Sequence, residues 1–160
     1  MEAIITRTVS TMIGAIYLAL LLNGHITSPD QIKGTVNEKE WRDMSSVIEC
    51  ENGSNSVKCR LLTGSVVLNR IASNKWKGST VEEVVMAKEG PYWQYAYTTR
   101  RDFYTKKCSE QTKAIAKYLL IYGSICPSNV MYQGQSLNGS GLYDYVDTPD
   151  GKEYFCYGKS

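Results

Sequence analysis

A long stretch without charge near the N-terminus limits what this chain can fold into more than any other feature. From Thr8 to Pro29 the sequence contains no Asp, Glu, Lys or Arg, and only Glu2 and Arg7 are charged before it. About 20 apolar residues span a bilayer, whereas the apolar core of a signal peptide has roughly 7–15. The stretch lies between these lengths, and short polar residues within it dilute its apolarity.

The segment that follows does not contain a clear small-x-small cleavage site, which favours an uncleaved signal anchor over a cleaved signal peptide. We therefore expect residues 1–29 to form a signal anchor or signal peptide, 30–37 a linker, and 38–160 a globular domain. Arg7 would stay on the cytoplasmic side, which places residues 38–160 outside the cytoplasm. The alternative is that the apolar stretch is a buried helix of the globular domain.

Composition fits one exported domain with a polar binding surface. A chain of 160 residues is long enough for one hydrophobic core, and a net charge of +2 is too small to favour nucleic acid as a partner. The sequence has twelve tyrosines and three tryptophans but only two phenylalanines. Tyrosine stacks through its ring and hydrogen-bonds through its hydroxyl, as sugar-binding grooves require. Most of these tyrosines can equally be edge and core residues.

The five cysteines agree with export, and their spacing is not that of a zinc site. They are Cys50, Cys59, Cys108, Cys126 and Cys156. Cys50 and Cys59 flank one turn, so a disulfide could fix it, or both could be reduced and buried. We expect no metal and no cofactor.

Residues 38–51 are expected to form a helix that ends on two glutamates. Asn37 is a suitable N-cap, and Glu40 stands at the spacing of a capping box. At about 100° per residue, Glu51 continues an apolar stripe along the helix, whereas Glu49 lies about 200° away on the opposite side. Glu49 is therefore expected to be an ordinary solvated glutamate.

A carboxyl group on an apolar stripe has a raised pKa, because burial disfavours its charged form. Such a group can deliver a proton to a leaving oxygen, as the general acid of a glycosidase does. The alternative is that Glu51 reaches water at the frayed helix end. The only histidine is His25, in the N-terminal segment, so an enzyme built from residues 38–160 would rely on carboxylate chemistry.

The remaining pattern predicts further helices followed by strands. We expect a central buried helix over 57–73, in which Asn69 hydrogen-bonds backbone, and a helix from the capping box of Ser79 and Glu82 to Gly90. We expect an amphipathic helix over 109–123, capped by Ser109 and ended by Gly123, and the tail after Pro127 lacks a helical period and favours strands. The fold class is therefore α+β, mainly helical, with a short C-terminal sheet after the hydrophobic N-terminal helix.

The block ECENGSNSVKCRLLTGSVVLNRI resembles the N-terminal signature of the spore-cortex-lytic and cell-wall hydrolase family, including its phage-encoded members. In that family a helix ends in a glutamate-rich turn, and a helix finishing in Val-x-Leu-Asn-Arg follows at a fixed distance; here that element is residues 66–70. Counting back from Asn69 places the catalytic glutamate on Glu51. Weaker similarity extends over most of 44–157: GPYWQYAYTT resembles a substrate loop, NVMYQGQS a strand lining the groove, and DGKEYFCY the closing motif.

The resemblance implies a small lysozyme-like catalytic domain over 38–160 that acts as a monomer on peptidoglycan. Family members are mostly lytic transglycosylases, in which one glutamate acts first as acid and then as base. It implies Glu51 as the catalytic residue, and Gln94, Tyr95, Tyr132 and Gln133 as substrate-binding residues. Tyr95 and Tyr132 could instead pack in the core.

Two positions depart from the family pattern. Glu153 stands where histidine is usual in the closing motif, and is a candidate accessory residue that could change the lyase into a hydrolase. Asn55 stands where the fuller family turn has a second glutamate. The loss of the closing histidine keeps open a different class, an exported protein that binds peptidoglycan or another glycan without cutting it.

Overall fold

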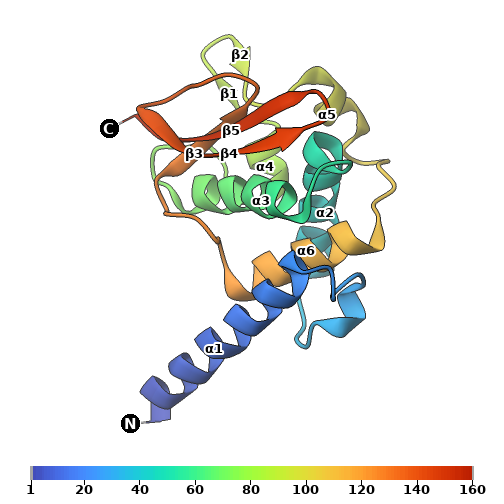
Figure 1. Ribbon diagram of the computed structural model, residues 1–160. Coiled ribbons are helices and arrows are strands. Elements are labelled where there is room, and N and C mark those ends of the chain that lie inside the picture. Colours follow the sequence, from blue (N-terminus) through green and yellow to red (C-terminus); the bar gives the residue numbers. More distant parts are fainter. Residues whose placement is uncertain (1, 160) are drawn as a thin grey trace.

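The computed structural model describes the backbone of residues 2–159 and the side chains of residues 9–159. The chain is α+β, as expected, with helices first and a small sheet at the C-terminal end (Figure 1). The elements are α1 (Glu2–Leu22), the 3-10 turn η1 (Pro29–Gln31), α2 (Glu38–Asn52), α3 (Val57–Ala72), α4 (Val81–Val85), β1 (Lys88–Glu89), β2 (Tyr92–Trp93), α5 (Tyr97–Asp102), α6 (Glu110–Tyr122), β3 (Val130–Gly134), β4 (Gly141–Thr148) and β5 (Gly151–Tyr157).

Helix α2 begins as predicted. The Asn37 side chain accepts a hydrogen bond from the Glu40 backbone N–H at 3.1 Å, which confirms the N-cap. The other half of the expected capping box is absent, since the Glu40 carboxylate accepts instead from the Val81 N–H of α4 at 3.4 Å. An acidic residue in the first turn of α2 therefore also satisfies a free N–H at the start of α4.

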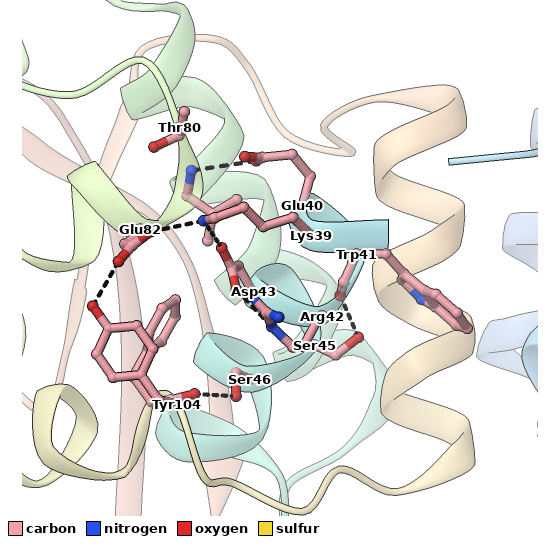
Figure 2. Close-up of polar contacts among 12 residues, drawn as sticks. Lys39, Glu40, Trp41, Arg42, Asp43, Ser45, Ser46, Thr80, Glu82 and Tyr104 are labelled. Carbon is pink, nitrogen blue, oxygen red and sulfur yellow. Dashed lines mark hydrogen bonds and ion pairs between the residues drawn. The ribbon is translucent and has the colours of Figure 1, made fainter. Parts of the chain in front are cut away.

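Polar contacts join the first half of α2 to α4 and to the segment after α5 (Figure 2). The Lys39 ammonium contacts the buried Asp43 carboxylate at 2.6 Å and Glu82 at 2.7 Å. Tyr104 donates to Glu82 at 2.6 Å, and the buried Ser46 hydroxyl donates to the Phe103 carbonyl at 2.6 Å. These contacts hold the first half of α2 and Ser46, near its middle, against α4 and the segment after α5.

Helix α3 is the central helix, as predicted. It packs on α2 and α6 on one side and on the sheet on the other (Figure 1). A Cβ at Gly64 would lie 2.4 Å from a Leu119 methyl carbon of α6 and 2.9 Å from an Ile48 methyl carbon of α2. Only a residue without a side chain lets the three helices converge here.

The region after α3 differs from the prediction. The expected helix over 79–90 is restricted to α4, and its N-cap is Thr80, whose hydroxyl accepts from the Glu83 N–H at 3.2 Å. Glu83, and not Glu82, completes the cap by accepting from the Ser79 N–H at 2.7 Å. Beyond α4 the chain forms the short antiparallel hairpin β1–β2, in which Gly90 adopts a φ of 58°.

The predicted C-terminal strands form an antiparallel sheet in the order β3-β5-β4. Phe155 of the central strand β5 is fully buried against α3, in a cluster that includes Cys59, Leu62 and Val66. Asn69 of α3 donates to the carbonyls of Pro127 at 2.8 Å and Val130 at 3.0 Å. The predicted role of Asn69 is thus confirmed, and the backbone that it binds is the start of the strand β3.

The N-terminal segment is partly integrated into the globular core, unlike the expectation that residues 1–37 lie outside it. Leu21, Ile26 and Ile32 are almost fully buried among core residues of the helices. The Tyr17 hydroxyl accepts from the Lys33 N–H at 3.1 Å, and its ring lies 5.7 Å from that of Tyr122 on α6. An apolar helix of this composition can bury one face on protein as readily as in lipid.

The first half of α1 extends away from the rest of the molecule (Figure 1). The exposed apolar side chains among the described residues of α1 include Val9, Met12, Ile13 and Ile16. Within the described residues, no helix combines the length and the apolarity needed to cross a membrane.

Candidate active site

The Glu51 carboxyl lies where three parts of the chain meet. Glu51 is the penultimate residue of α2 and is mostly buried. The Thr99 hydroxyl of α5 donates to Glu51 Oε1, and the Gln133 amide of β3 donates to Oε2 at 3.2 Å. Each carboxyl oxygen therefore has one neutral donor, which fixes the orientation of the group.

Burial raises the pKa of Glu51 above its ordinary value. The hydrogen bonds from Thr99 and Gln133 and the positive charge of Arg70 lower it, but by less than desolvation raises it. A raised pKa increases the fraction of Glu51 that holds its proton near neutral pH. This environment suits a general acid, as the position of Glu51 on the apolar stripe indicated.

Glu49 lies on the other side of α2 from this site, as predicted. It is not simply solvated, however, because its carboxylate accepts from the backbone N–H of Ser109 at 3.3 Å and from its hydroxyl at 3.2 Å. Ser109 is the N-cap of α6, so Glu49 stabilises the positive end of that helix. The two glutamates of one turn have different tasks.

Arg70 is the cation whose charge lowers the pKa of the Glu51 carboxyl, and it is almost fully buried. Its Nε donates to the Met131 carbonyl of β3 at 2.8 Å. The guanidinium carbon lies 4.3 Å from the Trp76 ring centroid and 5.2 Å from that of Tyr95. Among the residues that the structure describes, no carboxylate forms an ion pair with Arg70, so its charge acts on Glu51 through space.

Unpaired buried polar atoms gather around Glu51. Three of the four buried side-chain atoms without a well-formed hydrogen bond in the described structure are Arg70 Nη1, Tyr95 Oη and Gln133 Oε1, and the Tyr95 hydroxyl and the Arg70 guanidinium lie close enough to interact weakly with each other. Each such atom costs about 1–3 kcal/mol unless a partner is supplied. Their grouping beside one carboxyl is the arrangement expected where a polar ligand supplies partners.

Glu153 brings a second carboxyl group towards the site. It lies on β5, opposite Val146 of β4, and is half-buried. Burial raises its pKa, and the negative charge of Glu51 raises it further. Its polar neighbour Asn52, at the end of α2, has the opposite effect on that pKa.

Asn55 has a structural task in the turn after α2. Its amide donates to Asn52 Oδ1 at 2.6 Å, and the Asn52 amide donates to the Thr63 hydroxyl of α3 at 2.8 Å. Asn55, which stands where the turn of that family has a second glutamate, therefore stabilises the connection between α2 and α3. Within the described site, Glu153 is the second carboxyl near Glu51.

The predicted substrate-binding residues separate into two groups. Gln133 contacts Glu51 directly, while Gln94 and Tyr132 line a neighbouring pocket of about 800 Å³ that does not include Glu51. Tyr95 is only 5% exposed and belongs to the main core, which favours the alternative of core packing for this residue. Its hydroxyl is nevertheless one of the unpaired atoms beside Arg70.

Three residues of this region were not singled out from the sequence. Arg70 and Thr99 lie within the blocks that carry the resemblance, and their proximity to Glu51 arises only on folding. Trp76 lies in the polar loop SNKWKGS and packs edge-on against Tyr132 with ring centroids 5.5 Å apart. A tryptophan in an otherwise polar loop is the signal that could have identified it.

The cysteines take no part in this site. All five are free, so Cys50 and Cys59 do not form the disulfide that was one of two alternatives. Burial raises the pKa of the Cys50 thiol to about 11 and that of Cys59 to about 12. Both thiols are protonated at neutral pH and are poor nucleophiles.

Comparisons with known proteins do not identify the chain. No protein-family model, no curated protein and no solved structure matches it.

Proposed function

We propose that this chain cleaves the glycan strand of peptidoglycan between N-acetylmuramic acid and N-acetylglucosamine, with Glu51 as general acid and then general base. The observation that carries the proposal is the enclosed Glu51 carboxyl, held by Thr99 and Gln133 and raised in pKa by burial. The resemblance of residues 49–71 to cell-wall hydrolases supports the same residue. A lysozyme-like fold is part of the proposal.

The first step transfers the Glu51 proton to the glycosidic oxygen as the bond from that oxygen to the muramoyl C1 breaks. The leaving N-acetylglucosamine keeps the proton as a hydroxyl group, and positive charge develops at C1. Glu51 becomes a carboxylate. Thr99, Gln133 and the charge of Arg70 each stabilise that carboxylate, so the ionised form is accessible in a buried site.

In the second step the muramoyl 6-hydroxyl attacks C1 and gives its proton to the Glu51 carboxylate. The product is a 1,6-anhydro ring, no water is consumed, and Glu51 regains its starting protonation state. One carboxyl group is sufficient for this route, whereas hydrolysis ordinarily needs two. We therefore propose a lytic transglycosylase.

Glu153 favours hydrolysis as a second candidate. Its carboxyl lies close enough to Glu51 for the charge of one to raise the pKa of the other. In its ionised form it could take a proton from a water molecule that attacks C1 in place of the 6-hydroxyl. The product would then have a free reducing end and would be heavier by one water molecule.

Mass spectrometry of the digestion products tests these routes. Purified peptidoglycan is incubated with the protein in water labelled with oxygen-18. Anhydromuramoyl products without label support the transglycosylase, and labelled reducing ends that disappear in Glu153→Gln support hydrolysis. If the protein binds peptidoglycan but releases no fragments, it is a binding protein, and the proposed cleavage is wrong.

The proposal also requires that residues 38–160 reach the cell wall, which lies outside the cytoplasm. We propose that α1 provides export and attachment to the membrane. Fractionation of cells that express the full chain tests this. Recovery of all the protein from the cytosol would contradict it.

A further inference from the structure

The pocket of about 800 Å³ beside the candidate active site has a positively charged rim. It lies between the loop after α3, the β1–β2 hairpin and the edge strand β3. The charged residues that line it are Lys75, Lys77, Lys88, Lys159 and Glu89. Lysines thus outnumber carboxylates around this pocket, although the net charge of the whole chain is only +2.

The loop lysines have no counter-charge within the described protein. Lys75 and Lys77 are exposed and take part in none of the ion pairs of residues 9–159. The one acidic residue of the pocket, Glu89, accepts from the Gln94 amide at 3.1 Å. Their positive charge is therefore available to a ligand, and the walls of a pocket strengthen its effect.

The pocket and the candidate catalytic carboxyl are connected through Arg70. Trp76 lines the pocket, and its ring centroid lies 4.3 Å from the guanidinium carbon of Arg70, whose charge acts on Glu51. Tyr132 of β3 also lines the pocket, while the next residue, Gln133, projects from the opposite face of the strand and binds Glu51. A ligand in this pocket would thus lie on the other side of Arg70 and β3 from Glu51.

The glycan strand itself does not explain a cationic pocket. N-acetylglucosamine is neutral, and the lactyl carboxyl of N-acetylmuramic acid is converted into an amide where a stem peptide is attached. The free carboxylates of peptidoglycan are on the stem peptides, which project from muramoyl residues. A carboxylate that binds an ammonium group forms a charge-assisted hydrogen bond, roughly twice as strong as a neutral one.

We propose that this pocket binds the anionic stem peptide of the muramoyl residue at the cleavage site, through Lys75 and Lys77. The proposal rests on the proposed function and adds to it a preference for strands that carry peptides. Tyr132 and Trp76 supply an apolar wall for the peptide, and the two lysines bind its carboxylates.

A charge-reversal pair tests the proposal. Lys75→Glu/Lys77→Glu is compared with Lys106→Glu/Lys107→Glu, which makes the same change at exposed lysines between α5 and α6. Each protein digests two substrates, glycan strands with stem peptides and the same strands after enzymatic removal of the peptides. For the first variant we expect kcat/KM to fall at least about 10-fold on peptide-bearing strands, the effect of losing even one of the two charge-assisted bonds, and to stay within about 2-fold on naked strands.

The control variant should match wild type on both substrates. Equal losses on both substrates would show that the loop lysines contact the glycan, and no loss would show that they contact no ligand; either result overturns the proposal. Unchanged melting temperatures of both variants confirm that these exposed substitutions leave the fold intact.

Binding of a free stem tetrapeptide separates this proposal from the proposed function. Calorimetry with the Glu51→Gln protein requires no cleavage, and we expect binding that is lost in the added Lys75→Glu/Lys77→Glu background. If wild type cleaves neither substrate but the tetrapeptide binds through these lysines, the function is wrong and the pocket assignment stands. If naked strands are cleaved and the tetrapeptide does not bind, or glycerol phosphate polymer binds in its place, the pocket assignment is wrong.

Discussion

The Gln133 amide nitrogen lies 3.2 Å from Glu51 Oε2, so a strand residue 82 positions later in the chain orients the carboxyl at the end of α2. The bond is formed only when β3 packs beside α3. It links the formation of the sheet to the geometry of the candidate acid.

Removing either donor to Glu51 should change the pH dependence of cleavage. Gln133→Leu and Thr99→Val each take away a hydrogen bond that lowers the pKa of Glu51. That pKa should therefore rise, and the alkaline limb of the profile of kcat/KM against pH should move to higher pH. We expect turnover at the optimum to fall about 10-fold, because the carboxyl is less well oriented. Gln135→Leu, just beyond β3 and exposed, is the control; an unmoved limb in both site variants would contradict the assignment of Glu51 as the acid.

Arg70 should affect both stability and the acid. Arg70→Met removes the donor to the buried Met131 carbonyl, which should cost about 1–3 kcal/mol in the free energy of unfolding. It also removes the charge that lowers the pKa of Glu51, so the alkaline limb should again move to higher pH.

Arg60→Met is the matched control for Arg70→Met. Arg60 is equally a buried arginine of α3 and donates to the Thr112 hydroxyl at 3.0 Å, but its charged neighbour is Glu49. The Arg60→Met variant should be less stable than wild type, but its profile of kcat/KM against pH should not change. If the two variants have the same profile, Arg70 has only a structural role.

Glu51→Gln should stabilise the fold at neutral pH. Because burial raises the pKa of Glu51, the folded state binds more protons than the unfolded state at pH values between the ordinary pKa, about 4.3, and the folded one. The free energy of unfolding of the wild type therefore falls as pH rises through this window. The Glu51→Gln variant cannot ionise at this position and does not show that loss. Thermal unfolding of wild type and variant should differ at pH 7 and converge below pH 4.

Glu49→Gln should behave differently in the same unfolding experiment. Its carboxylate interacts with the start of α6, so the variant should lose about 0.5 kcal/mol at neutral pH. A stabilised Glu49 variant and a destabilised Glu51 variant would contradict the environments described here.

Truncation should show where the folded domain begins. A chain that lacks residues 1–12 retains Leu21, Ile26 and Ile32 and should unfold near the wild-type temperature. A chain that lacks residues 1–26 also loses Leu21 and Ile26 from the core, and each lost buried side chain should cost about 2–5 kcal/mol. Equal melting temperatures of the two truncated chains would show that the N-terminal helix does not contribute to the core.

Helix ends and helix faces could be predicted from the sequence, because they depend on residues close together in the chain. The caps at Asn37 and Ser109 and the stop at Gly123 were read correctly, because they depend on neighbours within one turn. The spacing within α2 was sufficient to separate Glu49 from Glu51. The hairpin around Gly90 was missed, since its short strands gave no period and were joined to the preceding helix.

Features that depend on tertiary contacts could not be predicted from the sequence. The donors to Glu51 come from positions 48 and 82 residues away, and the place of Arg70 depends on its bond to β3. The apolarity of residues 8–29 indicated burial but not whether lipid or protein covers them, and the packing of Tyr17 and Leu21 became evident only in the fold.

Comparison of Glu51→Gln with Glu49→Gln on purified peptidoglycan tests the central claim most directly. Both changes replace a carboxyl with a nearly isosteric amide in the same turn of α2, and release of soluble fragments is measured at equal concentrations of folded protein. We expect Glu51→Gln to lose at least about 100-fold in turnover, as for removal of a general acid, and Glu49→Gln to retain most activity. An inactive Glu49 variant together with an active Glu51 variant would contradict the account.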